Sequence, residues 1–238
     1  MATRSDYFPR HRFPISVIAY AVWLYFRFPV SVRDVETLLF ERGLVVSYET
    51  VRQWAQKFGD HFGQQLRARE RCPGRTWHLD EMAIKIAGKQ HWLWRAVDET
   101  GLELDLLVQE HRDTEAAKKF FQRVLDEVGE LPETVVTDGL RSCGAALREL
   151  PDFGGVEHVQ VKSEDRKNNR VEQAHQPSRL REKRMQGFRS RQHAQRFCSI
   201  LGHFRNFFAL KRHHLPAAEY RERLTERLLV WQAITTVS

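Results

Sequence analysis

Apolar residues repeat at helical spacing along the first 66 residues of the chain. Residues 14–28 form one apolar helical pattern, and residues 31–42 form a second one, in which Ser31 and Asp34 have the spacing of a capping box. A third pattern starts at Tyr48, directly after a serine that can serve as its N-cap. The N-terminal part is therefore predicted to contain three short helices.

The third of these helices is predicted to have an apolar and a polar face. Three short helices with the connection GLVVS before the last one are typical of a helix-turn-helix unit, whose last helix enters the major groove of DNA. A small helical bundle gives the same periodicity, so plain structural packing is the alternative. The apolar stripe comprises Val51, Trp54, Phe58 and Phe62, and the polar side chains available to DNA are Arg52, Gln53, Gln56 and Lys57.

A charged, turn-forming linker, residues 67–75, separates these helices from a part in which strand patterns dominate. Three predicted strands follow one another, in which apolar residues either alternate with polar ones or form a continuous run. The short turns AGKQ and ETG join them. Short turns between successive strands are typical of an antiparallel meander. The predicted strands are residues 76–88, 91–98 and 102–110.

Helices and strands alternate after the meander. The patterns predict a helix at 114–128, a short strand at 134–138, a helix at 141–149, a strand at 156–161 and a long helical region from about 168. This order of elements favours an α/β fold in which helices cover the faces of a mixed sheet.

Basic residues are concentrated in one part of the chain. The formal net charge is +7, and residues 160 to 214 contain 14 of the 38 Lys and Arg residues but only 4 of the 31 Asp and Glu residues. Such a segment is typical of a surface that binds a polyanion, most often nucleic acid. A basic face that is merely solvated is the alternative.

Length and composition exclude several classes of protein. With 238 residues, of which 42% are hydrophobic, the chain can bury a substantial core in one or two domains. The three cysteines are far apart, which fits neither a disulfide framework nor a zinc finger. The N-terminus lacks the apolar core of a signal peptide, and the most apolar stretch contains Arg27 and is short for a membrane span. We therefore expect a cytoplasmic protein.

Three acidic residues are candidates for chemistry. Asp80 lies mid-way along the first predicted strand beside apolar neighbours, where desolvation is costly unless a cation or hydrogen bonds offset it. Asp138 ends a short strand, and Glu172 lies in a long basic helix. Taken singly, each has a simpler explanation: Asp80 as a partner of a base or at an exposed rim, Asp138 in a turn, and Glu172 as a partner of Arg170 or Arg179.

Taken together, these acidic residues resemble a known family. An Asp on the first strand, an Asp at the tip of a later strand and a Glu on the next long helix form the pattern of the ribonuclease-H-like polynucleotidyl transferases. The segments WHLDEMAIKIAGKQHWLWRAVDETG, VVTDG and KNNRVEQAHQPSRLREKRMQGFRS closely resemble the DDE transposases of bacterial insertion sequences, in particular the insertion sequence six family. The resemblance covers nearly the whole chain, from about residue 14 to Trp231.

The resemblance implies a ribonuclease-H-like catalytic core preceded by an all-α helix-turn-helix domain. It also implies that Asp80, Asp138 and Glu172 are catalytic and bind two Mg²⁺ or Mn²⁺ ions. The chemistry of the residues supports this, because converging carboxylates repel one another unless divalent cations neutralise them, and hard oxygen ligands suit these ions. Two such ions can activate water or a 3′-hydroxyl and stabilise the leaving oxygen.

DNA is the partner that the resemblance implies, as terminal inverted repeats and as target, with at least a homodimer bringing two ends together. Arg179 would hold a DNA phosphate, and the basic neighbours of Glu172 would grip the strands. The residues predicted to contact DNA are Arg52, Gln53, Gln56, Lys57, Lys167, Arg170, Arg179 and Lys183.

Two features near these residues have a structural as well as a functional interpretation. His175 could help to position the scissile phosphate, but a surface or core histidine is the simpler interpretation. The phenylalanines of residues 192–215 could stack on DNA bases, yet Phe197, Leu201, Phe204 and Phe208 also form an amphipathic stripe, which favours packing.

The predicted organisation has four parts: a helix-turn-helix domain at 1–66, a linker at 67–75, a catalytic domain at 76–190 and a helical extension at 191–238. Two other classes of function remain open. A DNA-binding regulator would use the helix-turn-helix alone, so that the carboxylates would be incidental. A ribonuclease-H-like nuclease would share the metal site but would cut DNA without joining it.

Overall fold

The computed structural model describes residues 12–70, 72–161, 169–185, 187–210 and 215–236, and the side chains of residues 169–173 lie outside this description. By the contacts of its backbone, the chain forms two compact units. One combines residues 1–70 with 200–238, and the other comprises residues 71–199. No helix in the described ranges combines the length and the apolar character that a membrane span requires.

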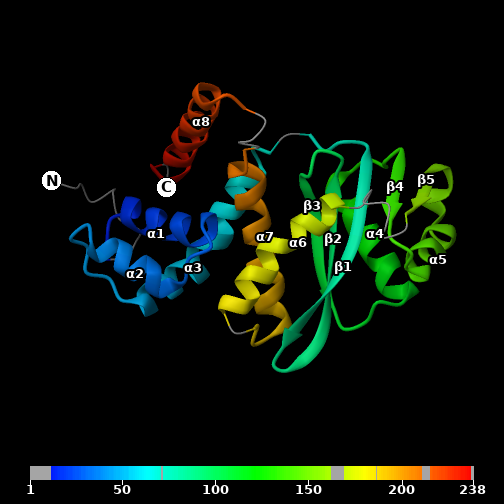
Figure 1. Cartoon of the computed structure of the whole chain (residues 1–238), viewed down its shortest axis with the longest axis horizontal. Helices are drawn as coiled ribbons and strands as arrows, with labels where there is room; N and C mark the ends of the chain where they lie inside the picture. Colours follow the sequence, from blue (N-terminus) through cyan, green and yellow to red (C-terminus); the bar gives the residue numbers. More distant parts are fainter. Residues whose placement is uncertain (1–11, 71, 162–168, 186, 211–214, 237–238) are drawn as a thin grey trace. The chain divides into compact units, whose positions relative to one another are not determined.

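The first unit begins with three helices (Figure 1), as the sequence predicted: α1 (Ile15–Arg27), α2 (Val32–Phe40) and α3 (Tyr48–Arg67). The capping box before α2 is present. The Ser31 hydroxyl accepts a hydrogen bond from the Asp34 backbone N–H at 3.1 Å, and the Asp34 carboxylate accepts one from the Ser31 N–H at 2.7 Å. These bonds satisfy two backbone donors that the start of a helix leaves without partners.

Aromatic side chains pack the first unit. Phe26 of α1 lies 5.3 Å from Phe204, centroid to centroid, and Phe62 of α3 lies 5.0 Å from Trp231. Phe204 belongs to α7 (Arg191–Phe208) and Trp231 to α8 (Ala217–Thr236), and these two rings are 5.5 Å apart. The C-terminal helices therefore complete the apolar core on which the N-terminal helices rest.

The second unit contains a five-stranded mixed sheet in the order β3-β2-β1-β4-β5. The first three strands form the predicted antiparallel meander, whereas β4 is parallel to both β1 and β5. This confirms the predicted mixed sheet, and its strand order agrees with the ribonuclease-H-like core that the resemblance implied. The strands are β1 (Thr76–Ile86), β2 (Lys89–Asp98), β3 (Glu103–Gln109), β4 (Thr134–Thr137) and β5 (Glu157–Gln160).

Helices cover both faces of this sheet. Trp77 and Leu79 of β1 pack in one apolar cluster with α4 (Thr114–Val128), α5 (Arg141–Glu149) and the short 3₁₀ helix η2 (Pro151–Gly155). Side chains alternate between the two faces of a strand, so the residues that follow Trp77 and Leu79 in β1 point to the opposite face of the sheet. That face receives α6 (Asn169–Arg184), a helix that contains Pro177.

The first part of α7 completes the exposed edge of the sheet. The Gln195 side chain donates to the Leu106 carbonyl at 2.9 Å and accepts from the Val108 N–H at 2.8 Å. A side-chain amide therefore continues the hydrogen-bond ladder of β3, whose edge would otherwise be free to pair with another chain.

The aromatic residues of α7 are buried, which confirms the structural interpretation of their spacing. Phe197, Leu201, Phe204 and Phe208 are each at most 5% exposed, and none is available to stack on a DNA base.

The packing of α7 generates a prediction about two phenylalanines of the first unit. Phe204 is fully buried, whereas Phe40 is 66% exposed. We expect Phe204→Ala to lower the free energy of unfolding by about 3 to 5 kcal/mol, because it leaves a cavity in the core. Phe40→Ala should change it by no more than about 0.5 kcal/mol. Urea denaturation measures both, and equal effects would contradict the assigned core.

Candidate active site

Asp80 and Asp138 follow paired positions of two neighbouring strands. In the parallel pairing of β1 with β4, Leu79 lies opposite Thr137. An aspartate comes directly after each of them, so the register places Asp80 beside Asp138 where β4 ends. Oxygen atoms of these two carboxylates and of Glu81 all lie within 4.8 Å of one another. The structure thus brings together the first two acidic residues that the sequence predicted.

Asp138 is held in place by the backbone that follows it. Its Oδ1 atom accepts a hydrogen bond from the Leu140 N–H at 3.0 Å, just before α5 begins. Burial raises the pKa of Asp138, and the negative charge of Asp80 raises it further, while the Leu140 hydrogen bond and the charge of Arg112 lower it. The net direction is upward, because burial and Asp80 together outweigh the two groups that favour the charged form.

Glu81 is a third carboxylate of this cluster, and sequence reasoning missed it. Its side chain is only 4% exposed. Burial, followed by the charges of Asp138 and Asp80, raises the pKa of Glu81 to about 7. Strand alternation assigns Asp80 and Glu81 to opposite faces, so no local pattern indicates that they belong to one site. β4 ends opposite Leu79, however, and Asp138 comes directly after that end. Asp138 therefore lies beside the edge of β1 and not over one of its two faces.

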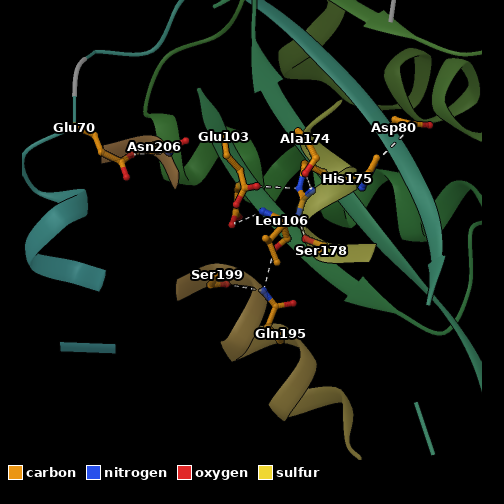
Figure 2. A network of polar contacts seen from close by, with 12 residues as sticks. Glu70, Asp80, Glu103, Leu106, Ala174, His175, Ser178, Gln195, Ser199 and Asn206 are labelled. Carbon is orange, nitrogen blue, oxygen red and sulfur yellow. Dashed lines mark hydrogen bonds and ion pairs between the residues drawn. The ribbon is translucent and has the colours of Figure 1, made fainter. Parts of the chain in front are cut away.

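The third predicted acid, Glu172, lies in the first turns of α6, and its side chain is outside the described residues. The next part of the same helix reaches the cluster. His175 Nε2 lies 3.5 Å from Asp80 Oδ2. This contact joins α6 to β1 at Asp80, the first of the three predicted catalytic residues (Figure 2).

His175 is a core histidine. It is 1% exposed, and burial lowers its pKa to about 4, although the contact with Asp80 acts in the opposite direction. The imidazole is therefore neutral at pH 7, and its contact with Asp80 is a polar contact rather than a salt bridge. Its burial favours the structural interpretation over direct contact with a scissile phosphate.

A buried arginine of β2 attaches α6 to the sheet. Arg95 is 1% exposed, and its guanidinium donates to the Ala174 carbonyl and, at 2.8 Å, to the Ser178 hydroxyl. Its Nε atom lies 2.9 Å from Glu103 Oε2 of β3, which supplies the opposite charge. Figure 2 shows Glu103, Ala174 and Ser178 gathered around this point. Two strands thus hold the segment of α6 that follows Glu172.

The residues predicted to contact DNA lie on exposed surfaces wherever the structure describes them. On α3 the four polar residues are exposed, and Arg52 and Gln53 both bond to Glu49. On α6, Arg179 and Lys183 are exposed. Lys167 and the side chain of Arg170 fall outside the described residues. The exposed residues of α3 are Arg52, Gln53, Gln56 and Lys57.

Comparison with known proteins identifies the family. Residues 74–214, more than half of the chain, match the model of the DDE domain. The chain is also 32% identical over 181 residues to a Staphylococcus aureus protein, the transposase for insertion sequence-like element IS431mec, covering 76% of this chain and 80% of that protein. The chain belongs to the DDE transposases. This confirms the resemblance on which the sequence analysis relied.

A second Staphylococcus aureus relative of this DDE transposase supports the assignment. It is the transposase for insertion sequence element IS257 in transposon Tn4003, 31% identical over 181 residues, with 76% of this chain and 80% of that protein covered. DDE transposases are polynucleotidyl transferases, so the protein is an enzyme of that class.

Solved integrase structures are more distantly similar to the DDE transposase. The HTLV-2 integrase catalytic core domain, in complex with magnesium and in a dimeric form, has 14% identity and a TM-score of 0.36, over 43% of this chain and 65% of that chain. A chain of the simian T-cell lymphotropic virus intasome has 16% identity and the same TM-score of 0.36, over 43% of this chain and 37% of that chain. The family assignment rests on the DDE domain and the transposase relatives.

The Arg95 network of the DDE transposase generates a prediction about stability. Arg95→Met leaves the Glu103 carboxylate buried without its cation, so we expect the free energy of unfolding to fall by about 3 to 5 kcal/mol. The double variant Arg95→Met with Glu103→Leu removes both charges and should recover much of this loss. Chemical denaturation of the two single variants and the double variant measures the coupling. Additive losses would show that the two charges do not act as a pair.

Proposed function

We propose that this protein is the transposase of an insertion sequence that binds the terminal inverted repeats of its element, cleaves their 3′ ends and joins them to target DNA. The convergence of Asp80 with Asp138 at the end of β4, inside a DDE domain, is the observation that carries this proposal. A carboxylate cluster of this kind is suited to metal-dependent phosphoryl chemistry.

The residues at this cluster fit a divalent cation. Hard carboxylate oxygens are the ligands that Mg²⁺ and Mn²⁺ prefer. Burial and the neighbouring acids raise the pKa of Asp138 and Glu81, and a bound cation would favour their charged forms. In the proposed site Asp80 and Asp138 hold two ions and Glu172 of α6 completes the set. Bound ions of this type supply Lewis acidity for the activation of a nucleophilic oxygen and for the stabilisation of a leaving one.

The chain's own residues are proposed to bind and orient the DNA around these carboxylates. Exposed Arg179 and Lys183 of α6 lie on the helix that carries Glu172, where they can hold phosphates next to the reacting bond. Lys167 and Arg170 are proposed to do the same. This arrangement explains why an acid stands among so many bases: the acid belongs to the metal site and the bases bind the substrate.

The N-terminal helices are proposed to recognise the ends of the element. In a helix-turn-helix unit the last helix enters the major groove, which assigns this role to α3 and its exposed face. We retain the functional division into residues 1–66, 67–75, 76–190 and 191–238, in which the last part supports the N-terminal helices through Phe204 and Trp231. Because two DNA ends react together, we propose that at least a homodimer assembles on DNA in the bacterial cytoplasm.

Strand transfer tests the proposed chemistry. We expect Asp80→Asn, Asp138→Asn and Glu172→Gln each to reduce joining of a labelled inverted-repeat end to plasmid DNA by about a hundredfold or more, because a lost metal ligand removes several kcal/mol of transition-state stabilisation. Binding of the end, followed by electrophoretic mobility shift, should persist. Joining by the wild type should require Mg²⁺ or Mn²⁺.

The same assay separates the proposal from its alternatives. If the wild type binds ends but neither cuts nor joins with either metal, and the variants behave identically, the protein is a DNA-binding regulator. If it cuts but never joins a 3′-hydroxyl end to a second DNA, it is a nuclease.

The proposed role of α3 predicts a change in salt dependence. Lys57→Gln should weaken end binding and reduce the slope of log affinity against log salt by about 1, because one phosphate contact is lost. Arg221→Gln, an equally exposed change on α8, should leave the slope unchanged. Fluorescence anisotropy at several salt concentrations measures both, and identical slopes for the two variants would remove Lys57 from the interface.

A further inference from the structure

Glu81 is buried in the acidic cluster with only part of its charge compensated. Its Oε1 atom lies 3.5 Å from Arg112 Nη1, whereas Oε2 is buried and has no hydrogen-bond partner. A carboxylate oxygen taken out of water without a partner carries a large desolvation penalty. The backbone places the Glu81 carboxylate next to two further acids, which adds repulsion instead of removing it.

Arg112 is a weak partner for such a group. Its side chain is 50% exposed, and its guanidinium lies over the Trp92 ring, 4.1 Å from the ring centroid. A half-exposed arginine at 3.5 Å contributes far less than a close bidentate pair. A buried structural ion pair holds its carboxylate at close range, whereas here the cation is 3.5 Å away and Oε2 has no hydrogen bond.

A buried carboxylate of the same sheet shows what a structural pair looks like. Asp105 of β3 is paired with Arg123, whose Nε atom lies 2.6 Å from Asp105 Oδ2, and its Oδ1 accepts a hydrogen bond from the Leu106 N–H at 2.8 Å. Both oxygens of Asp105 therefore have partners. Asp105 Oδ2 and Glu81 Oε2 both lack a hydrogen bond, but Asp105 Oδ2 lies 2.6 Å from its cation. Glu81 differs because Arg112 lies 3.5 Å from its other oxygen, and because it faces two other carboxylates.

We propose that Glu81 is a fourth acidic residue of the metal centre, where it binds a divalent cation together with Asp80 and Asp138, and that Arg112 competes with the cation for Glu81. This inference rests on the proposed function and deepens it. The bound cation satisfies Glu81 Oε2 and screens the repulsion among the three carboxylates. Arg112 partly neutralises the cluster until the cation binds.

Mn²⁺ binding to the full chain without DNA tests the role of Glu81. We expect Glu81→Gln to weaken Mn²⁺ affinity, measured by isothermal titration calorimetry and by the electron paramagnetic resonance signal of free Mn²⁺, by about 10- to 100-fold. Asp105→Asn is the matched control, because it neutralises another buried, arginine-paired carboxylate, and it should retain wild-type affinity. Thermal unfolding without metal should show Glu81→Gln folded and no less stable than the wild type.

Arg112, which is half-exposed, provides a second test, in which Mn²⁺ affinity is expected to rise instead of fall. Arg112→Gln removes a competing positive charge, so Mn²⁺ affinity should rise roughly two- to fivefold at low salt. Unchanged or weaker Mn²⁺ binding would contradict the proposal that Arg112 competes with the cation for Glu81. A purely structural Glu81–Arg112 pair predicts that neither variant alters Mn²⁺ affinity.

The outcomes distinguish this inference from the proposed function. If the wild type binds Mn²⁺, Asp80→Asn loses it and Glu81→Gln retains it, the metal centre stands and the role of Glu81 is refuted. If Glu81→Gln and Asp105→Asn weaken binding equally, the effect is general and the inference also fails. If the wild type itself does not bind Mn²⁺, the proposed metal centre fails and this inference fails with it.

Discussion

Repulsion among carboxylates is the constraint on which the rest of this structure depends. The parallel pairing of β1 with β4 places Asp80 beside Asp138, and Glu81 joins them within the same few ångströms. Like charges at this separation in a partly buried setting oppose folding, so the surrounding elements have to hold them there. The apolar cluster beneath Trp77 and Leu79 supplies that support from one face of the sheet.

On the opposite face, polar contacts position α6, in addition to the apolar contact of Ala174 with Val97. Arg95 binds the carbonyl of Ala174 and the hydroxyl of Ser178, and Glu103 balances its charge. A buried network of this kind is directional, because its donors and acceptors are satisfied in one arrangement only. An apolar contact would allow α6 to slide or rotate. The network therefore suits a helix that is proposed to carry an acidic residue of the metal site, Glu172.

Local patterns in the sequence predicted the helices and strands well. The capping box at Ser31 and the alternation of apolar residues in β1 depend on near neighbours in the chain, and so does the antiparallel meander with its short turns. Asp80, Asp138 and Glu172 were predicted as a set because the family pattern joins residues that are distant in sequence. Glu81 was not found, since alternation alone assigns it to the face opposite Asp80.

By itself, the sequence determined the order and type of the elements, the concentration of basic charge after residue 160 and the membership in a transposase family, because these follow from local periodicity, composition and family motifs. Only the tertiary structure decided that Glu81 reaches the acidic cluster, that His175 is buried and neutral, and that Arg95 attaches α6 to the sheet. Each of these depends on the register and the docking of segments far apart in the chain, and on the desolvation that their contact produces.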